Sequence, residues 1–177
     1  ATAAYPVPVP KPYVSGQEAV GIVEDASANM KHLLGKRVVG YTPQPFGSFA
    51  EYCIATPALL FECPEQFSDE EGAAYLIAAH TAYHAVHRRG QVRAGETVLV
   101  LGAAGGVPSA AVQLCVAAGC HVIAVAGGKE KMAFCKALGA HTLIDHQAED
   151  FVEAVRRETN GRGVNAIVDF VQGEAGQ

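Results

Sequence analysis

One stretch of the sequence constrains the fold more than any other: Thr97-Val-Leu-Val-Leu-Gly-Ala-Ala-Gly-Gly-Val-Pro-Ser-Ala-Ala-Val-Gln113. The apolar run at its start predicts a buried strand, and the Ala-rich pattern after the glycines predicts a helix. A glycine turn between strand and helix lets the backbone approach a pyrophosphate, while the helix N-terminus offers amide donors and a positive dipole. The stretch therefore predicts a dinucleotide-binding unit in which Gly105, Gly106 and Val107 surround the pyrophosphate.

The same alternation of strand and helix continues to the end of the chain. Gly119 and Gly139 stand where left-handed helix caps are expected. Repeats of this length predict a parallel sheet with right-handed crossovers. A doubly wound sheet would order the strands 3-2-1-4 and leave the last strand as an apolar edge. The expected strands are 97–101, 120–126, 141–145 and 164–169, and the expected helices are 106–118, 129–138 and 149–159.

The first third of the chain has a different pattern, in which prolines punctuate short β runs at 19–24, 37–41 and 49–55. This pattern predicts a small β-barrel-like domain. Ser68-Asp-Glu-Glu71 is a capping-box sequence, so we expect a helix to begin there and to run to about Arg89. We therefore expect one domain over 1–90, including this linking helix, and a second over 91–177.

The bulk composition excludes several classes of function. Of the 177 residues, 50% are hydrophobic, and the formal net charge of −5 argues against nucleic acid or an anionic membrane as a partner. There is no apolar run of about 18 residues that would predict a transmembrane helix. The five cysteines form no Cys-x-x-Cys pair, which favours free thiols and a cytoplasmic location.

Six motifs occur in an order and spacing that resemble the zinc-free quinone oxidoreductases (zeta-crystallin-like) of the medium-chain dehydrogenase/reductase superfamily. They are Gly16-Gln-Glu-Ala-Val-Gly-Ile-Val23, Gly35-Lys-Arg-Val38, Gly47-Ser-Phe-Ala-Glu-Tyr52, Thr81-Ala-Tyr83, Gly105-Gly-Val107 and Gly161-Arg-Gly-Val164. The resemblance runs from about Tyr5 to the end. It implies an α/β fold: a partial GroES-like β-barrel domain, then the first half of a Rossmann doubly wound sheet. Family members are nearly twice as long and form homodimers, so we expect a fragment, incomplete at both ends and poorly stable or inactive alone.

The end of the second Rossmann strand predicts the choice of cofactor. NAD-binding proteins carry an Asp or Glu there for the ribose 2′-hydroxyl, about 20 residues after the glycines. This chain instead has Ala126-Gly-Gly-Lys-Glu-Lys131, which lacks a terminal acid and offers lysine to a 2′-phosphate, so NADPH is favoured over NADH. The alternative for the lysines is ordinary solvated helix charge.

The resemblance adds further cofactor contacts. It places Gly127 and Lys131 at the 2′-phosphate, His146 beside the adenine and Thr81 near the nicotinamide. A surface imidazole and a helix threonine bonded to its own backbone are the alternatives for His146 and Thr81. Pro108 stands where the family has a third glycine, so we expect the turn to survive with a weakened hold on the cofactor.

The sequence offers little for metal or acid–base catalysis. The zinc dehydrogenases of the superfamily use a Gly-His-Glu motif, but here it reads Gly16-Gln17-Glu18, and glutamine is a poor zinc ligand. His80, His84 and His87 fall on one helical face without an accompanying acid or cysteine, which favours a polar seam over a metal site. Tyr5 is the one candidate catalytic residue, on a loose alignment, and we expect no general acid among the others.

The resemblance implies an NADPH-dependent, zinc-independent enzyme that transfers hydride to a quinone or an activated α,β-unsaturated carbonyl. An enoyl-thioester reductase shares the fold and cofactor and stays open as an alternative. A non-catalytic NADPH-binding protein, or a truncated relic, stays open as another.

Overall fold

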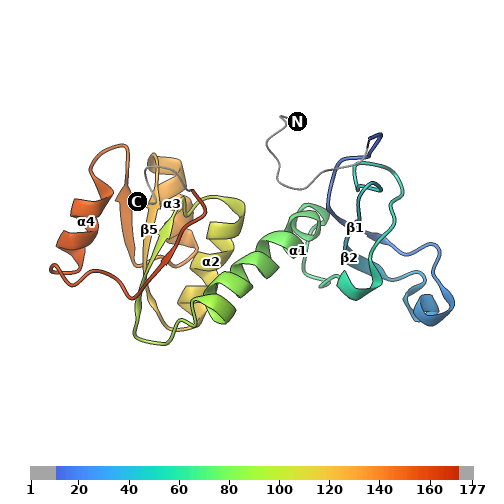
Figure 1. The fold of residues 1–177 in the computed structure, drawn as a ribbon, viewed down its shortest axis with the longest axis horizontal. Helices are drawn as coiled ribbons and strands as arrows, with labels where there is room; N and C mark the ends of the chain where they lie inside the picture. The colour runs from blue at the N-terminus through green and yellow to red at the C-terminus, as the bar shows by residue number, and fades with distance from the viewer. Residues whose placement is uncertain (1–10, 172–177) are drawn as a thin grey trace. The chain divides into compact units, whose positions relative to one another are not determined.

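The computed structural model describes residues 11–171 (Figure 1). The chain divides into two compact units between Ile77 and Ala78. This boundary falls inside helix α1 (Asp69–Tyr83), which continues directly into a π-helical segment, η3 (His84–Arg89).

The first unit is built on a three-stranded antiparallel sheet. Its strands are β1 (Glu18–Ile22), β2 (Arg37–Tyr41) and β3 (Leu60–Glu62), in the order β1-β2-β3. In this sheet Val39 opposes Val20 on one side and Phe61 on the other. Two short 3₁₀ helices, η1 (Ala28–Leu33) and η2 (Pro57–Leu59), lie in the connections.

The expected strand over 49–55 is wrong. That segment bends instead, because the amide of Phe49 donates to the carbonyl of Ser15 and the amide of Ala50 donates to that of Ser48. The second neighbour of β2 is β3, which the β pattern of the sequence did not predict. A cavity of about 990 Å³ opens in this unit beside β1 and the 50–55 segment.

Helix α1 begins with the predicted capping box. The amide of Glu71 donates to Oγ of Ser68 at 3.2 Å, and the amide of Ser68 donates back to Oε2 of Glu71 at 2.9 Å. At the start of a helix these two amides have no carbonyl of the helix as a partner, and the capping box supplies both acceptors. Further along, the amide of Ile77 donates to Oε2 of Glu18 at 2.9 Å, which ties α1 to β1.

The second unit is a parallel sheet in which strands and helices alternate, as predicted. The strand order β6-β5-β4-β7 is the expected 3-2-1-4 order. The strands pair in parallel. The elements are β4 (Thr97–Leu101), α2 (Gly106–Ala117), β5 (His121–Ala126), α3 (Lys129–Ala137), β6 (Thr142–Asp145), α4 (Phe151–Glu158) and β7 (Ala166–Val168).

Helices cover both faces of this sheet (Figure 1). Successive strand residues point to opposite faces, so Val98 and Val100 pack with α2 and α3 while Leu99 and Leu101 pack with α4. Strand β7 lies at the edge and pairs only with β4 among the described strands, with Ile167 60% exposed. The doubly wound architecture is therefore confirmed for these four strands.

Both predicted glycine caps are confirmed, and they have the same geometry. At the end of α2, Gly119 has a φ of +78° and its amide donates to Val116, while the amide of Cys120 donates to Cys115. At the end of α3, Gly139 has a φ of +95°, and the corresponding amides donate to Lys136 and Cys135. This pattern of two hydrogen bonds is the Schellman motif, which ends each helix at its glycine.

All five cysteines are free thiols, as the sequence predicts. Within residues 11–171, no helix combines the length and the hydrophobicity that a membrane crossing requires.

Candidate dinucleotide-binding site

The glycine turn after β4 redirects the chain sharply into α2. Gly102 has a φ of +60°, a left-handed conformation that favours glycine, and a side chain there would also displace Val171, whose Cγ2 would lie 2.9 Å from the added Cβ. The amide of Gly105 donates to the carbonyl of Gly102 at 2.8 Å and closes the turn. The amide of Ala103 donates to the carbonyl of Val125 at 2.9 Å, which anchors the turn to β5.

The N-terminus of α2 presents two unused amide donors. The first bond to a carbonyl at the helix start runs from the amide of Ser109 to Gly105, at 2.9 Å. The amides of Gly106 and Val107 have no acceptor among the residues the structure describes. A Cβ built on Gly106 meets nothing within 4 Å, so there is free space beside the first residue of the helix. Free amides at the positive end of a helix fit a pyrophosphate.

Pro108 is the third residue of α2, and its side chain is buried. Because intrahelical bonding begins at the next residue, its missing N–H removes no bond from the helix. Its ring packs toward Gly105, where a Cβ would lie 3.5 Å from the proline Cδ. The proline is therefore compatible with both the turn and the helix. Its only cost is the missing N–H, which would have been the third donor toward a ligand.

A second group of residues gathers at the adjoining ends of β5 and β6. Gly128, with a φ of +85°, precedes α3 as its N-cap. A Cβ on Gly127 would lie 2.7 Å from Nε2 of His146 and 2.9 Å from Nε2 of Gln147. The structure thus brings two of the predicted cofactor residues, Gly127 and His146, against one another.

Lys131 belongs to the same edge, as the third residue of α3, and its side chain is exposed. Neither Lys131 nor Lys129 forms an ion pair with any residue in the described range 11–171. Cations at the positive end of a helix are unfavourable by ~0.3–1 kcal/mol each. Glu130 stands between them in the same turn, so the two lysines against one glutamate leave only a small excess of positive charge, which an anion would offset.

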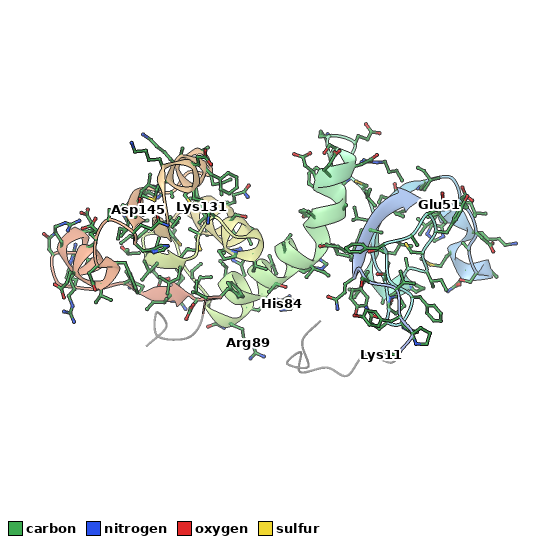
Figure 2. The ribbon with its side chains drawn as sticks, turned by 90° about the horizontal axis from the view of Figure 1, so that it is seen from above. Lys11, Glu51, His84, Arg89, Lys131 and Asp145 are labelled. Atoms are coloured by element: carbon green, nitrogen blue, oxygen red, sulfur yellow. The ribbon has the colours of Figure 1, made fainter. Side chains whose placement is uncertain are left out.

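The sequence analysis missed Asp145, the last residue of β6. Its Oδ1 accepts the amide of Gly128 at 3.1 Å and the amide of Gln147 at 3.0 Å. These two bonds, with Gln147 contributing most, lower the pKa of Asp145 below its ordinary value. The available signal was an acid at the carboxyl end of a predicted strand, because the carboxyl ends of parallel strands meet at one edge. Figure 2 labels Asp145 and Lys131, at the end of β6 and on α3.

The other predicted site residues are less closely defined. Thr81 lies on α1 with its side chain exposed, and its hydroxyl forms no hydrogen bond to the part of the chain that the structure describes. It therefore does not bond its own backbone and is open to a ligand. Tyr5 lies outside the described residues.

The histidines of α1 and η3 make aromatic contacts. The ring of His87 lies 4.8 Å from that of Tyr83, and the ring of His84 packs edge-on to the same tyrosine at 6.4 Å. Among residues 11–171, no group of three or more His, Cys, Asp or Glu residues is placed to hold a metal ion.

Comparison with known proteins gives consistent matches. The family profile of the zinc-binding dehydrogenases matches residues 106–176. A quinone oxidoreductase of Pongo abelii is 31% identical over 160 residues, which cover 90% of this chain and 49% of that protein. The chain thus spans about half the length of the quinone oxidoreductases it matches.

Solved structures agree with the sequence matches. The Escherichia coli quinone oxidoreductase, crystallised with NADPH, superposes with a TM-score of 0.83 at 29% identity, over 96% of this chain and 52% of that one. The CurK enoyl reductase superposes with a TM-score of 0.79 at 27% identity, over 92% and 48% of the two chains. The motifs, the strand order and these matches agree, and over about half of their length the chain is similar to the quinone oxidoreductases of the medium-chain dehydrogenase/reductase superfamily.

Proposed function

We propose that this protein is an NADPH-dependent, zinc-independent oxidoreductase that reduces a quinone or an activated α,β-unsaturated carbonyl. Residues 91–177 would belong to its NADPH-binding domain and residues 1–90 to its GroES-like catalytic domain. The observation that carries the proposal is the pair of amides, those of Gly106 and Val107, which have no acceptor in the described part of the chain and lie at the N-terminus of α2. Such donors suit a pyrophosphate.

The choice of NADPH rests on the second group of residues. The unpaired Lys131 in the first turn of α3 is a counter-charge for a 2′-phosphate. His146, packed against Gly127, would lie beside the adenine. The carboxylate of Asp145 is at the same edge, but two amide donors already offset its charge. Thr81, with its free hydroxyl, would contact the nicotinamide end.

When bound, NADPH supplies a hydride from its nicotinamide ring. The chain's own contribution would be to hold the two phosphate groups and to orient the cofactor relative to the acceptor. With no Lewis acid to polarise a carbonyl, acceptors that take hydride readily are favoured, and quinones are of this kind. An enoyl thioester is the second candidate acceptor, because the CurK enoyl reductase shares this fold.

Cofactor binding is tested by replacing Gly106. A side chain there meets nothing within 4 Å, so both Gly106→Asp and Gly106→Asn should fold. The aspartate puts a negative charge beside the pyrophosphate while favouring the helix dipole, and the asparagine is its neutral control of equal size. We expect NADPH binding, followed by fluorescence titration, to be lost in the aspartate variant and largely kept in the asparagine variant.

Turnover then separates the candidate functions. NADPH oxidation is followed with 1,4-benzoquinone and with a crotonyl thioester as acceptors. A preference for the quinone supports the proposal, and a preference for the thioester supports the enoyl reductase. Binding without turnover of either acceptor favours a non-catalytic NADPH-binding protein. Equal binding by both Gly106 variants and the unchanged chain would contradict the pyrophosphate site itself.

A further inference from the structure

Asp145 joins two loops that carry predicted cofactor residues. It ends β6 and pairs in register with Ala126, the last residue of β5. Its Oδ1 accepts one amide from each loop: that of Gly128, which starts α3, and that of Gln147, which follows β6. A single carboxylate oxygen therefore links the loop leading to Lys131 with the loop containing His146.

The two loops lie close together at Gly127, where an added side chain would displace the side chains of His146 and Gln147. Gly127 lies so close to His146 and Gln147 that a Cβ would come within 3 Å of both. Gly128 has a φ of +85°, a conformation that other residues adopt only under strain. The two loops are thus joined by the Asp145 bonds and by the amide of His146, which donates to the carbonyl of Ala126 at 3.2 Å. Of these, only the bonds of Asp145 reach Gly128 and Gln147.

The charge of Asp145 argues against a direct role at a phosphate. A carboxylate repels a 2′-phosphate, but two amide donors share the charge of this one, and two lysines stand in the adjoining helix turn. An alternative is that the remaining oxygen, Oδ2, accepts a ribose hydroxyl as the strand-end acid of NAD-binding proteins does. The two roles differ in which nucleotide they favour.

We propose that Asp145 is a positioning residue, which holds the β5–α3 turn and the end of β6 together so that Lys131 and His146 meet one 2′-phosphoadenosine group. The inference rests on the proposed NADPH function and deepens it. Asparagine can replace aspartate in this role, because its carbonyl oxygen also accepts amide donors. Alanine cannot.

The chain contains a matched control in Asp150. Its Oδ1 also accepts two amides, from Val152 at 2.9 Å and Glu153 at 3.0 Å, and so caps α4. The two aspartates therefore make the same kind of contact at different places. Asp150→Ala should destabilise the fold as Asp145→Ala does. Its bonds run to α4, at the far end of the loop containing His146, and none runs to the β5–α3 turn that leads to Lys131.

The experiment measures the dissociation constant of 2′,5′-ADP, which carries the 2′-phosphate, and that of 5′-AMP, which does not, by calorimetry on the 177-residue chain. Asp145→Ala should weaken 2′,5′-ADP binding by about tenfold, the equivalent of one lost hydrogen bond to a charged group. Asp145→Asn and Asp150→Ala should both bind 2′,5′-ADP with a dissociation constant close to that of the unchanged chain. Amide hydrogen exchange at Gly128 should accelerate in Asp145→Ala alone.

Each other result counts against the inference. Unchanged 2′,5′-ADP binding by Asp145→Ala, or an equal loss in Asp150→Ala, overturns the positioning role. If Asp145→Asn loses affinity for 5′-AMP but keeps its affinity for 2′,5′-ADP, then Asp145 accepts a ribose hydroxyl instead. If the unchanged chain binds neither NADPH nor 2′,5′-ADP, the proposed function fails and this inference with it, a result distinct from failure of the variants alone.

Discussion

Replacing Lys131 with alanine tests whether the first turn of α3 selects the 2′-phosphate. Lys131 is exposed, and it forms no ion pair with any residue in the described part of the chain, so the substitution removes no contact that stabilises the fold. Without ligand, the helix should even gain about 0.3–1 kcal/mol, because a cation leaves its positive end. With ligand, a charge-assisted bond to the phosphate is lost.

The expected size of that loss follows from the exposure of the lysine. A charge-assisted hydrogen bond at an exposed position contributes about 1–2 kcal/mol, which corresponds to a rise of about 5- to 30-fold in the dissociation constant of NADPH. NADH has no 2′-phosphate, so its dissociation constant should stay nearly unchanged. Affinity and stability should therefore move in opposite directions in this one variant.

The assay is a fluorescence titration with each cofactor, together with thermal unfolding of the same samples. Lys136→Ala is the control, because Lys136 lies in the last turn of the same helix, where a cation is favourable. The Lys136→Ala variant should be slightly less stable than the unchanged chain and should bind NADPH with the same dissociation constant. Equal losses for NADPH and NADH in Lys131→Ala, or no loss for either, would refute the 2′-phosphate role.

Three further predictions concern the metal, the proline and pH. Treatment with a chelator should leave activity intact and elemental analysis should find no zinc, whereas one stoichiometric zinc required for activity would contradict zinc independence. Pro108→Gly should tighten NADPH binding several-fold by restoring an amide donor, and should lower the melting temperature because the buried ring is lost; unchanged binding would make Pro108 a neutral first-turn proline. Because the folded pKa of Asp145 lies below its ordinary value of 3.8, its bonds should stabilise the fold fully above that pH and lose effect as the pH falls through the folded pKa. Urea unfolding should then show that the difference in the free energy of unfolding between the unchanged chain and Asp145→Ala narrows only below about pH 4. A difference that stays constant down to pH 2 would contradict this.

The second unit could be predicted closely because its signals are local. Apolar runs, Gly119 and Gly139 each act within a few residues, and the strands they predict agree with β4, β5, β6 and β7 to within about two residues at each end. The order of the strands was predicted as that of a doubly wound sheet.

The errors lie where pairing depends on distant partners. The 49–55 segment has residues that suit a strand, but its first amides bond to Ser15 and Ser48, and the three residues of β3 take the place beside β2. Asp145 was missed for the same reason: its role depends on an amide 17 residues earlier in the chain, which only the register of β5 and β6 brings near. A pattern read along one strand does not contain that contact.

The shared cap at the ends of α2 and α3 makes the chain sensitive to changes in length. Gly119 stands two residues before β5, and Gly139 stands three residues before β6. Deleting one residue between a cap and its strand would shift the strand by one position, and side chains that now face α2 and α3 would turn toward α4. Single-residue insertions and deletions should therefore be excluded from these two joints during evolution.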